Sequence, residues 1–140
     1  MIQRTNVLLV DDDQSVRQSL ERALKLENFH VLAAANRQEA VRSFGDNRVD
    51  VVLLDLDLGR ENGLETFRDL KEMEPLLPVI IMTAHSDQAG ILAAHDIQTV
   101  LEKPLDLPLL FHKLSQAAAE SGLRRERGSG IVAENEMAEK

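Results

Sequence analysis

The sequence predicts an α/β fold, an open, doubly wound parallel sheet of five strands with helices on both faces. Short apolar runs alternate five times with segments of helical periodicity along the 140 residues. The third and fourth runs, 51–54 and 79–82, are apolar at every position, which is typical of strands covered by helices on both faces. Right-handed crossovers between such strands give a doubly wound sheet, with its binding crevice at the carboxyl ends of the strands.

Two helices are predicted between the first three strands, which are the runs 7–10, 30–33 and 51–54. The first helix extends from Gln14 to about Glu27, because apolar residues recur on one face at the spacing i, i+4, i+7, i+8. Asn36 can cap the second helix, whose third position is Glu39.

The second half of the chain continues this alternation. A turn over Gly59–Gly63 leads into a third helix, which ends before the prolines that precede the strand at 79–82. A brief fourth helix is predicted over 87–94, a fifth strand over 99–101, and a last helix over 107 to about 119.

The organisation of the chain follows from the point where the periodicity fades. Residues 1–120 are predicted to form one domain. Residues 121–140, which contain Gly128-Ser129-Gly130 and an acidic end, are predicted to be a flexible polar tail without an effector domain.

Composition excludes several classes of function. The length suits one domain with a single core, and the absence of cysteine excludes disulfides and thiolate metal sites. No apolar stretch approaches the roughly 20 residues that cross a membrane, and residues 1–5 do not begin a signal peptide, so we expect a cytoplasmic protein. The formal net charge of −8 disfavours broad nucleic-acid binding and favours divalent cations and basic partner surfaces.

Polar side chains follow four of the predicted strands. Asp11–Asp13 follow the first strand, Asp55 the third, Thr83 the fourth and Lys103 the fifth. Because the carboxyl ends of parallel strands meet at one edge, these groups should share a pocket. Two carboxylates about 4 Å apart repel by roughly 4 kcal/mol at an effective dielectric constant near 20, so the acids need a cation. Mg²⁺ suits a few carboxylates plus a phosphate, and the resulting site could transfer a phosphoryl group.

Each residue also has a structural explanation when it is taken alone. Asp13, which precedes a helix, is a candidate helix cap, a threonine at a strand end often caps as well, and a lysine before proline is usually solvated. The four histidines have no spacing that suggests a metal site or a nucleophile. The joint occurrence at four strand ends, in this order, favours the shared pocket.

The motifs that carry this pocket resemble the receiver domain of two-component response regulators, over about residues 5–118. They are Val-Leu-Leu-Val-Asp-Asp-Asp at 7–13, Val-Val-Leu-Leu-Asp-Leu-Asp-Leu at 51–58, Gly63-Leu64-Glu65, Ile-Ile-Met-Thr-Ala-His at 80–85 and Leu-Glu-Lys-Pro at 101–104. The resemblance implies a flavodoxin-like fold with strand order 2-1-3-4-5 and five flanking helices.

The resemblance implies that Asp55 accepts a phosphoryl group from a phosphohistidine on a sensor kinase or a histidine phosphotransfer protein. It also implies the other site residues: Mg²⁺ would be held by Asp12, Asp55 and the backbone carbonyl of Asp57, with Asp11 behind them, and the phosphoryl oxygens by Thr83 and Lys103. In such domains the Lys103–Pro104 bond is often cis. Chemistry beyond self-phosphorylation and autodephosphorylation is not implied, so the chain is not expected to be an enzyme.

The chain departs from the family pattern at a residue of the switch that transmits phosphorylation from the pocket to the surface. The aromatic residue that pairs with the threonine in the family's switch is replaced by Val100, and the chain has no tyrosine. We therefore expect signalling through the Thr83 loop and the surface around the fourth helix. A homodimer could form through the face of the fourth helix, fifth strand and fifth helix. Asp57 and His85 flank the line along which water is expected to attack the acyl phosphate, and they are candidates to tune its lifetime.

One alternative is a phosphatase. Asp55-Leu56-Asp57 also matches the D-x-D motif of haloacid-dehalogenase-like phosphatases, although in those enzymes the D-x-D strand comes first in the chain. Catalytic release of phosphate from a small ester would indicate the phosphatase, and stoichiometric labelling of Asp55 would indicate the receiver.

A second alternative concerns output. About 20 residues follow the predicted domain, too few for a helix-turn-helix module, and the basic cluster at 124–127 is interrupted by Glu126. Direct DNA binding is therefore not expected. The chain is predicted to be a single-domain regulator that acts on a protein partner, with the receiver of a longer DNA-binding regulator as the alternative.

Overall fold

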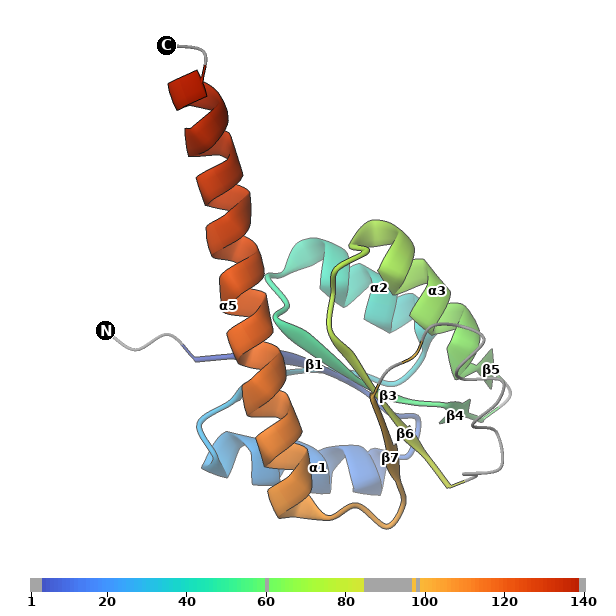
Figure 1. Cartoon of the computed structure of the whole chain (residues 1–140). Coiled ribbons are helices and arrows are strands. Elements are labelled where there is room, and N and C mark those ends of the chain that lie inside the picture. Colours follow the sequence, from blue (N-terminus) through green and yellow to red (C-terminus); the bar gives the residue numbers. More distant parts are fainter. Residues whose placement is uncertain (1–3, 60, 85–96, 98, 139–140) are drawn as a thin grey trace.

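A computed structural model of the chain confirms the doubly wound parallel sheet (Figure 1). The structure describes residues 4–59, 61–84, 97 and 99–138. The sheet consists of β1 (Asn6–Val10), β2 (His30–Ala34), β3 (Val51–Asp55), β6 (Val79–Thr83) and β7 (Thr99–Glu102). Its order is β2-β1-β3-β6-β7 with all neighbours parallel, which is the predicted order 2-1-3-4-5.

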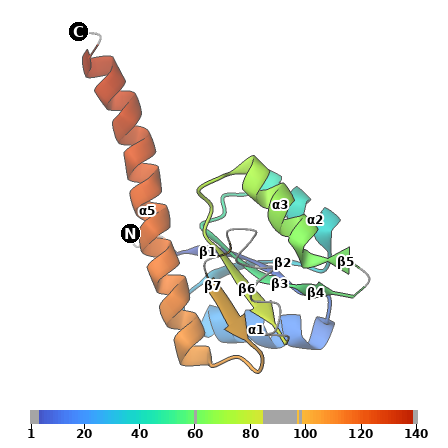
Figure 2. The same ribbon diagram turned by 45° about the vertical axis from the view of Figure 1, so that its right-hand side comes forward.

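Helices cover both faces of the sheet (Figures 1 and 2). They are α1 (Gln14–Leu26), α2 (Arg37–Asp46), α3 (Gly63–Met73) and α5 (Leu107–Ala138). The helices α2 and α3 cover one face, and α1 and the first part of α5 cover the other. The predicted fourth helix, 87–94, lies outside the described residues.

Short polar side chains fix where the helices begin. The carboxylate of Asp13 accepts a hydrogen bond from the backbone N–H of Val16 at 3.1 Å, so Asp13 is the N-cap of α1. Asn36 accepts from the N–H of Glu39 at 2.9 Å, which confirms the predicted cap of α2. Asn62 caps α3 through the N–H of Leu64 at 2.9 Å. Each such cap satisfies a backbone donor that the first turn of a helix leaves unpaired.

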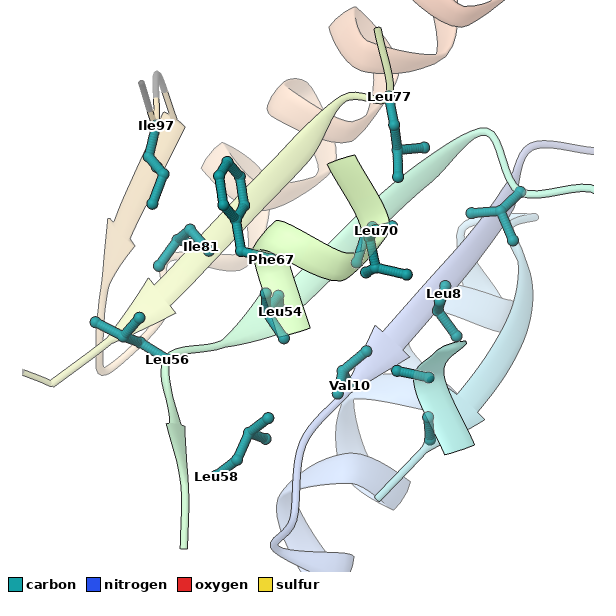
Figure 3. Packing of buried hydrophobic residues seen from close by; sticks show 14 residues of the cluster. Leu8, Val10, Leu54, Leu56, Leu58, Phe67, Leu70, Leu77, Ile81 and Ile97 are labelled. Atoms are coloured by element: carbon teal, nitrogen blue, oxygen red, sulfur yellow. The ribbon is translucent and has the colours of Figure 1, made fainter. Parts of the chain in front are cut away.

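Alternation along the strands divides the core into two clusters. In β1, Leu8 and Val10 pack toward α2 and α3, whereas Val7 and Leu9 pack toward α1 and α5, and all four are fully buried. Figure 3 shows the first cluster, in which Phe67 and Leu70 of α3 lie over the sheet. Burying one such side chain stabilises the fold by about 1.5–3 kcal/mol. The central strands are therefore a rigid base for the groups at their ends.

Two parts of the backbone differ from the prediction. The turn expected over Gly59–Gly63 overlaps a small antiparallel hairpin of β4 (Asp57–Leu58) and β5 (Glu61–Asn62). The last helix was expected to end near Ala119 and instead continues to Ala138, so the backbone is helical where a flexible tail was predicted. Among the described glycines only Gly59 has a positive φ. No glycine in this segment therefore adopts the left-handed conformation that commonly ends a helix. The domain boundary near residue 120 stays a prediction.

Candidate functional site

The register of the sheet brings the predicted polar groups to one edge. Val10 pairs with Leu54, Asp55 with Met82 and Thr83 with Glu102, so these strands end at the same level. Hydrogen bonds continue the pairing past the strand ends, with the N–H of Lys103 donating to the carbonyl of Thr83 at 2.8 Å. The peptide bond between Lys103 and Pro104 is cis, as the resemblance implied.

Asp55 lies at the centre of this edge, with 2% of its surface exposed. Its Oδ2 accepts a hydrogen bond from Nζ of Lys103 at 2.9 Å, and its Oδ1 accepts from the backbone N–H of Asp57 at 3.0 Å. Burial alone lowers the pKa of Lys103, but the hydrogen bond to Asp55 and the attraction of nearby carboxylates outweigh burial and raise it. Lys103 is therefore a permanent cation beside Asp55 at neutral pH.

Asp11 and Asp12 complete an acidic cluster with Asp55. One carboxylate oxygen from each of the three residues lies within 4.8 Å of the others. Asp11 is fully buried, and its Oδ1 accepts from the N–H of Asp13 at 2.9 Å, while its buried Oδ2 has no hydrogen-bond partner among the described residues. A buried carboxylate oxygen without a donor is costly. This oxygen and its acidic neighbours fit a hard divalent cation such as Mg²⁺, which takes oxygen ligands.

The remaining predicted residues lie near this cluster in different ways. Thr83 is buried at the end of β6. Asp57 has an exposed side chain, and its backbone N–H donates to Asp55 in the site. Val100 lies in β7 opposite Ile81 and is 38% exposed. His85 lies outside the described residues.

Two contacts to the pocket were missed by the sequence reasoning. Arg17 of α1 donates from Nη1 to the carbonyl of Asp11 at 2.8 Å. Gly59 has φ +63°, and a Cβ atom at this position would lie 2.8 Å from Oδ2 of Asp12. The hairpin turn therefore approaches Asp12 as closely as a residue without a side chain allows. The sequence assigned Gly59 only to a turn, and no pattern in a single sequence indicates that Arg17 contacts the pocket.

The pH dependence of stability should report the crowding of these acids. Burial raises the pKa of Asp11 from 3.8 to about 6, with repulsion from Asp55 and Asp12 adding to it and the N–H of Asp13 opposing it. The folded state therefore holds the Asp11 proton more tightly than the unfolded chain, and this group makes the protein less stable as pH rises from about 4 to 6.

Asp11→Asn removes this cost because the amide has no charge to bury. Without divalent cations, the free energy of unfolding at pH 7 is expected to rise by about 1–3 kcal/mol. Urea denaturation in a chelating buffer between pH 4 and 8 measures this difference, which should shrink toward pH 4. A difference that does not change with pH would contradict the prediction.

Comparisons with known proteins agree with the function that the groups at the strand ends indicate. The family model for the response regulator receiver domain matches residues 7–115. The chain belongs to this family. Receiver domains are phosphoacceptors in two-component systems, and as a family they bind Mg²⁺ at an acidic pocket and interact with histidine kinases.

Relatives extend the family assignment to known regulators. The chain is 37% identical over 108 residues to the DNA-binding transcriptional regulator NtrC of Proteus hauseri. The match covers 76% of this chain and 23% of NtrC, so the chain spans about a quarter of that relative's length. Within the described residues, none of the helices is both long enough and apolar enough to cross a membrane.

Solved structures show the same fold. A receiver domain protein from Clostridium thermocellum superposes with a TM-score of 0.78 at 28% identity, covering 85% of this chain and 98% of that one. The response regulator TrrA of Thermotoga maritima, in complex with Mg²⁺-BeF, superposes with a TM-score of 0.74 at 25% identity, covering 81% and 98%. The predicted fold and the predicted family are therefore both confirmed.

Proposed function

We propose that Asp55 accepts a phosphoryl group from the phosphohistidine of a sensor histidine kinase or a histidine phosphotransfer protein. One observation carries the proposal: a buried carboxylate at a strand end holds Lys103 at 2.9 Å and shares an acidic cluster with Asp11 and Asp12. A buried acid with a lysine alone would be a structural ion pair. Two further acids beside it make a site that is stable only with added positive charge.

The transfer step assigns a role to each group. A carboxylate oxygen of Asp55 forms a bond to phosphorus as the bond from phosphorus to the donor imidazole breaks, and the electron pair stays on the imidazole. Lys103, which now contacts Asp55, would bind a phosphoryl oxygen after transfer, and the Thr83 hydroxyl another. Groups placed where charge develops stabilise the transition state without further rearrangement.

Mg²⁺ would be held by Asp12, Asp55 and the backbone carbonyl of Asp57, with Asp11 orienting these ligands from behind. The clustered carboxylates support this assignment, and so does TrrA, which has been solved with Mg²⁺-BeF. When bound, the ion neutralises charge on the transferring oxygens. The crowding of three acids around one lysine is then relieved.

The chain's activity is proposed to stop at self-phosphorylation and autodephosphorylation. Membership of the receiver family, whose members are phosphoacceptors, supports this against the phosphatase alternative. The N–H of Asp57 is committed to Asp55, and its exposed side chain stands outside the acidic cluster, which is a poor position for the general acid of a D-x-D phosphatase.

The output is proposed to be a change in contacts with a protein partner, reached from Thr83 at the end of β6. The predicted fourth helix lies outside the described residues. Val100 supplies no aromatic ring for the family's switch. The alternative, the receiver part of a longer DNA-binding regulator, is compatible with the match to NtrC, of which the chain covers 23%. In either case the phosphoryl chemistry at Asp55 is the same.

A labelling experiment on the wild-type chain tests the acceptor. Incubation with MgCl₂ and acetyl phosphate is expected to add one phosphoryl group per chain, detected by mass spectrometry of the intact protein and mapped to the peptide that contains residues 51–58. Labelling should be lost when the divalent cation is chelated. A chain that stays unlabelled, or that releases phosphate from small esters over many turnovers, would overturn the proposal.

A further inference from the structure

We propose that Arg37 and Glu61 form a clamp that positions the β4–β5 hairpin as one wall of the acidic pocket and thereby sets its affinity for Mg²⁺. The inference rests on the proposed function, because the pocket is the same. The two residues are 24 positions apart in the chain and belong to α2 and β5, so neither is a residue of the pocket itself.

The hairpin is a wall of the pocket at two points. The N–H of Asp57 in β4 donates to Asp55 at 3.0 Å, and the space beside Gly59 is filled by the carboxylate of Asp12. The hairpin ladder pairs Asp57 with Asn62 and Leu58 with Glu61. A shift of β5 therefore moves β4 and both contacts with the pocket.

Two-residue strands do not hold such a hairpin in place by themselves, because an isolated pair of strands is marginally stable even when it is longer. Its outer strand is anchored instead. Oε2 of Glu61 accepts from the backbone N–H of Arg37 at 3.2 Å, a donor that the first turn of α2 leaves without a helical partner. A carboxylate at a helix N-terminus is also favoured by the helix dipole.

The side chain of Arg37 fixes α2 to α3. Its Nε and Nη2 donate to the two oxygens of Asp69 at 2.6 and 3.2 Å, and its Nη1 donates to Glu65 at 2.7 Å. A two-point contact between a guanidinium and a carboxylate restricts orientation as well as distance. The start of α3 is itself tied to the pocket, since the N–H of Gly63 donates to the carbonyl of Leu56 at 2.9 Å. In both views of the fold β5 lies beside the start of α3 (Figures 1 and 2).

The test is the affinity for Mg²⁺, measured by calorimetric titration with MgCl₂, in the wild type and in Arg37→Ala, Arg37→Lys and Glu61→Gln. Each variant is expected to raise the dissociation constant by about two- to fivefold, the range that exposed ion pairs contribute. Arg37→Ala is the most informative variant, because the two possible effects of this substitution change the Mg²⁺ affinity in opposite directions. Removing a positive charge near an acidic pocket would strengthen Mg²⁺ binding by its field alone, whereas loss of the clamp weakens it.

Lys25→Ala is the matched control. It removes a positive charge and breaks an exposed ion pair, Lys25 with Glu21 at 3.0 Å, on α1. This variant should bind Mg²⁺ as the wild type does or slightly more tightly. Arg37→Lys keeps the charge but not the two-point contact, so it should resemble Arg37→Ala.

A second measurement needs no metal. In the metal-free protein, hydrogen exchange of the Asp57 amide should be faster in Arg37→Ala and Glu61→Gln than in the wild type, at temperatures well below the unfolding midpoint of each. Unchanged exchange together with unchanged or stronger Mg²⁺ binding overturns the clamp. If the wild type itself binds no Mg²⁺, the proposed function fails, and the exchange data still decide the clamp. If Arg37→Ala does not fold, Arg37→Lys gives the answer. The Mg²⁺ affinity of Glu61→Gln cannot replace it, because loss of a negative charge near the pocket weakens Mg²⁺ binding by its field alone.

Discussion

Asp55→Asn is expected to abolish phosphoryl labelling while leaving the chain folded. The amide oxygen is not a nucleophile comparable to a carboxylate oxygen, so the bond to phosphorus cannot form. Stability should change by no more than about 1 kcal/mol, because two effects oppose each other. The single amide oxygen can accept from Lys103 or from Asp57 but not in the two-oxygen arrangement of the acid, while repulsion from Asp11 and Asp12 is relieved.

The control for this variant removes a different buried carboxylate next to the same strand. Asp50, with 2% of its surface exposed, precedes β3 and accepts from the backbone N–H of Asn6 at 2.8 Å, at the opposite edge of the sheet. Asp50→Asn should be labelled to the same extent as the wild type once it is folded. Intact-protein mass after incubation with acetyl phosphate and MgCl₂ measures both variants. A full label on Asp55→Asn would mean that another residue is the acceptor.

The site could be predicted from the sequence to the extent that it depends on strand ends. Apolar runs such as Val51–Leu54 have one stable place, a central strand, and the residue that follows each run must then lie at the carboxyl edge of the sheet. The contact of Asp55 with Lys103, 48 residues later, follows from this rule and from no local signal.

The parts that could not be predicted depend on contacts that leave no periodic pattern. The β4–β5 hairpin has two residues in each strand, too few for alternation to be visible, and the partners of Arg37 lie 24 to 32 residues away. The length of α5 was misjudged for a different reason. The end of this helix was predicted near Ala119 because the apolar periodicity fades there, although a helix ends only where the backbone leaves the helical conformation.

Gly63→Ala is expected to destabilise the protein, although alanine is the better helix former. Gly63 is buried at the first position of α3. A Cβ atom there would lie 2.7 Å from the carbonyl oxygens of Asp55 and Leu56 and 2.8 Å from the Cα of Leu56. All three are backbone atoms, so no side chain can rotate away, and the strand end must move. Overpacking of this kind costs about 1–3 kcal/mol, more than the gain of about 1 kcal/mol in helix propensity.

Gly122→Ala separates the gain in helix propensity from the cost of overpacking, because alanine at this position brings the gain without a clash. Nothing lies within 4 Å of a Cβ atom at Gly122 in α5, so this variant should be more stable than the wild type by up to about 1 kcal/mol. Urea denaturation of both variants in metal-free buffer therefore should give shifts of opposite sign. A Gly63→Ala variant as stable as the wild type would show that the strand end yields easily. Such yielding is hard to reconcile with a preorganised acceptor, since one of the two atoms nearest the added Cβ is the backbone carbonyl oxygen of Asp55 itself.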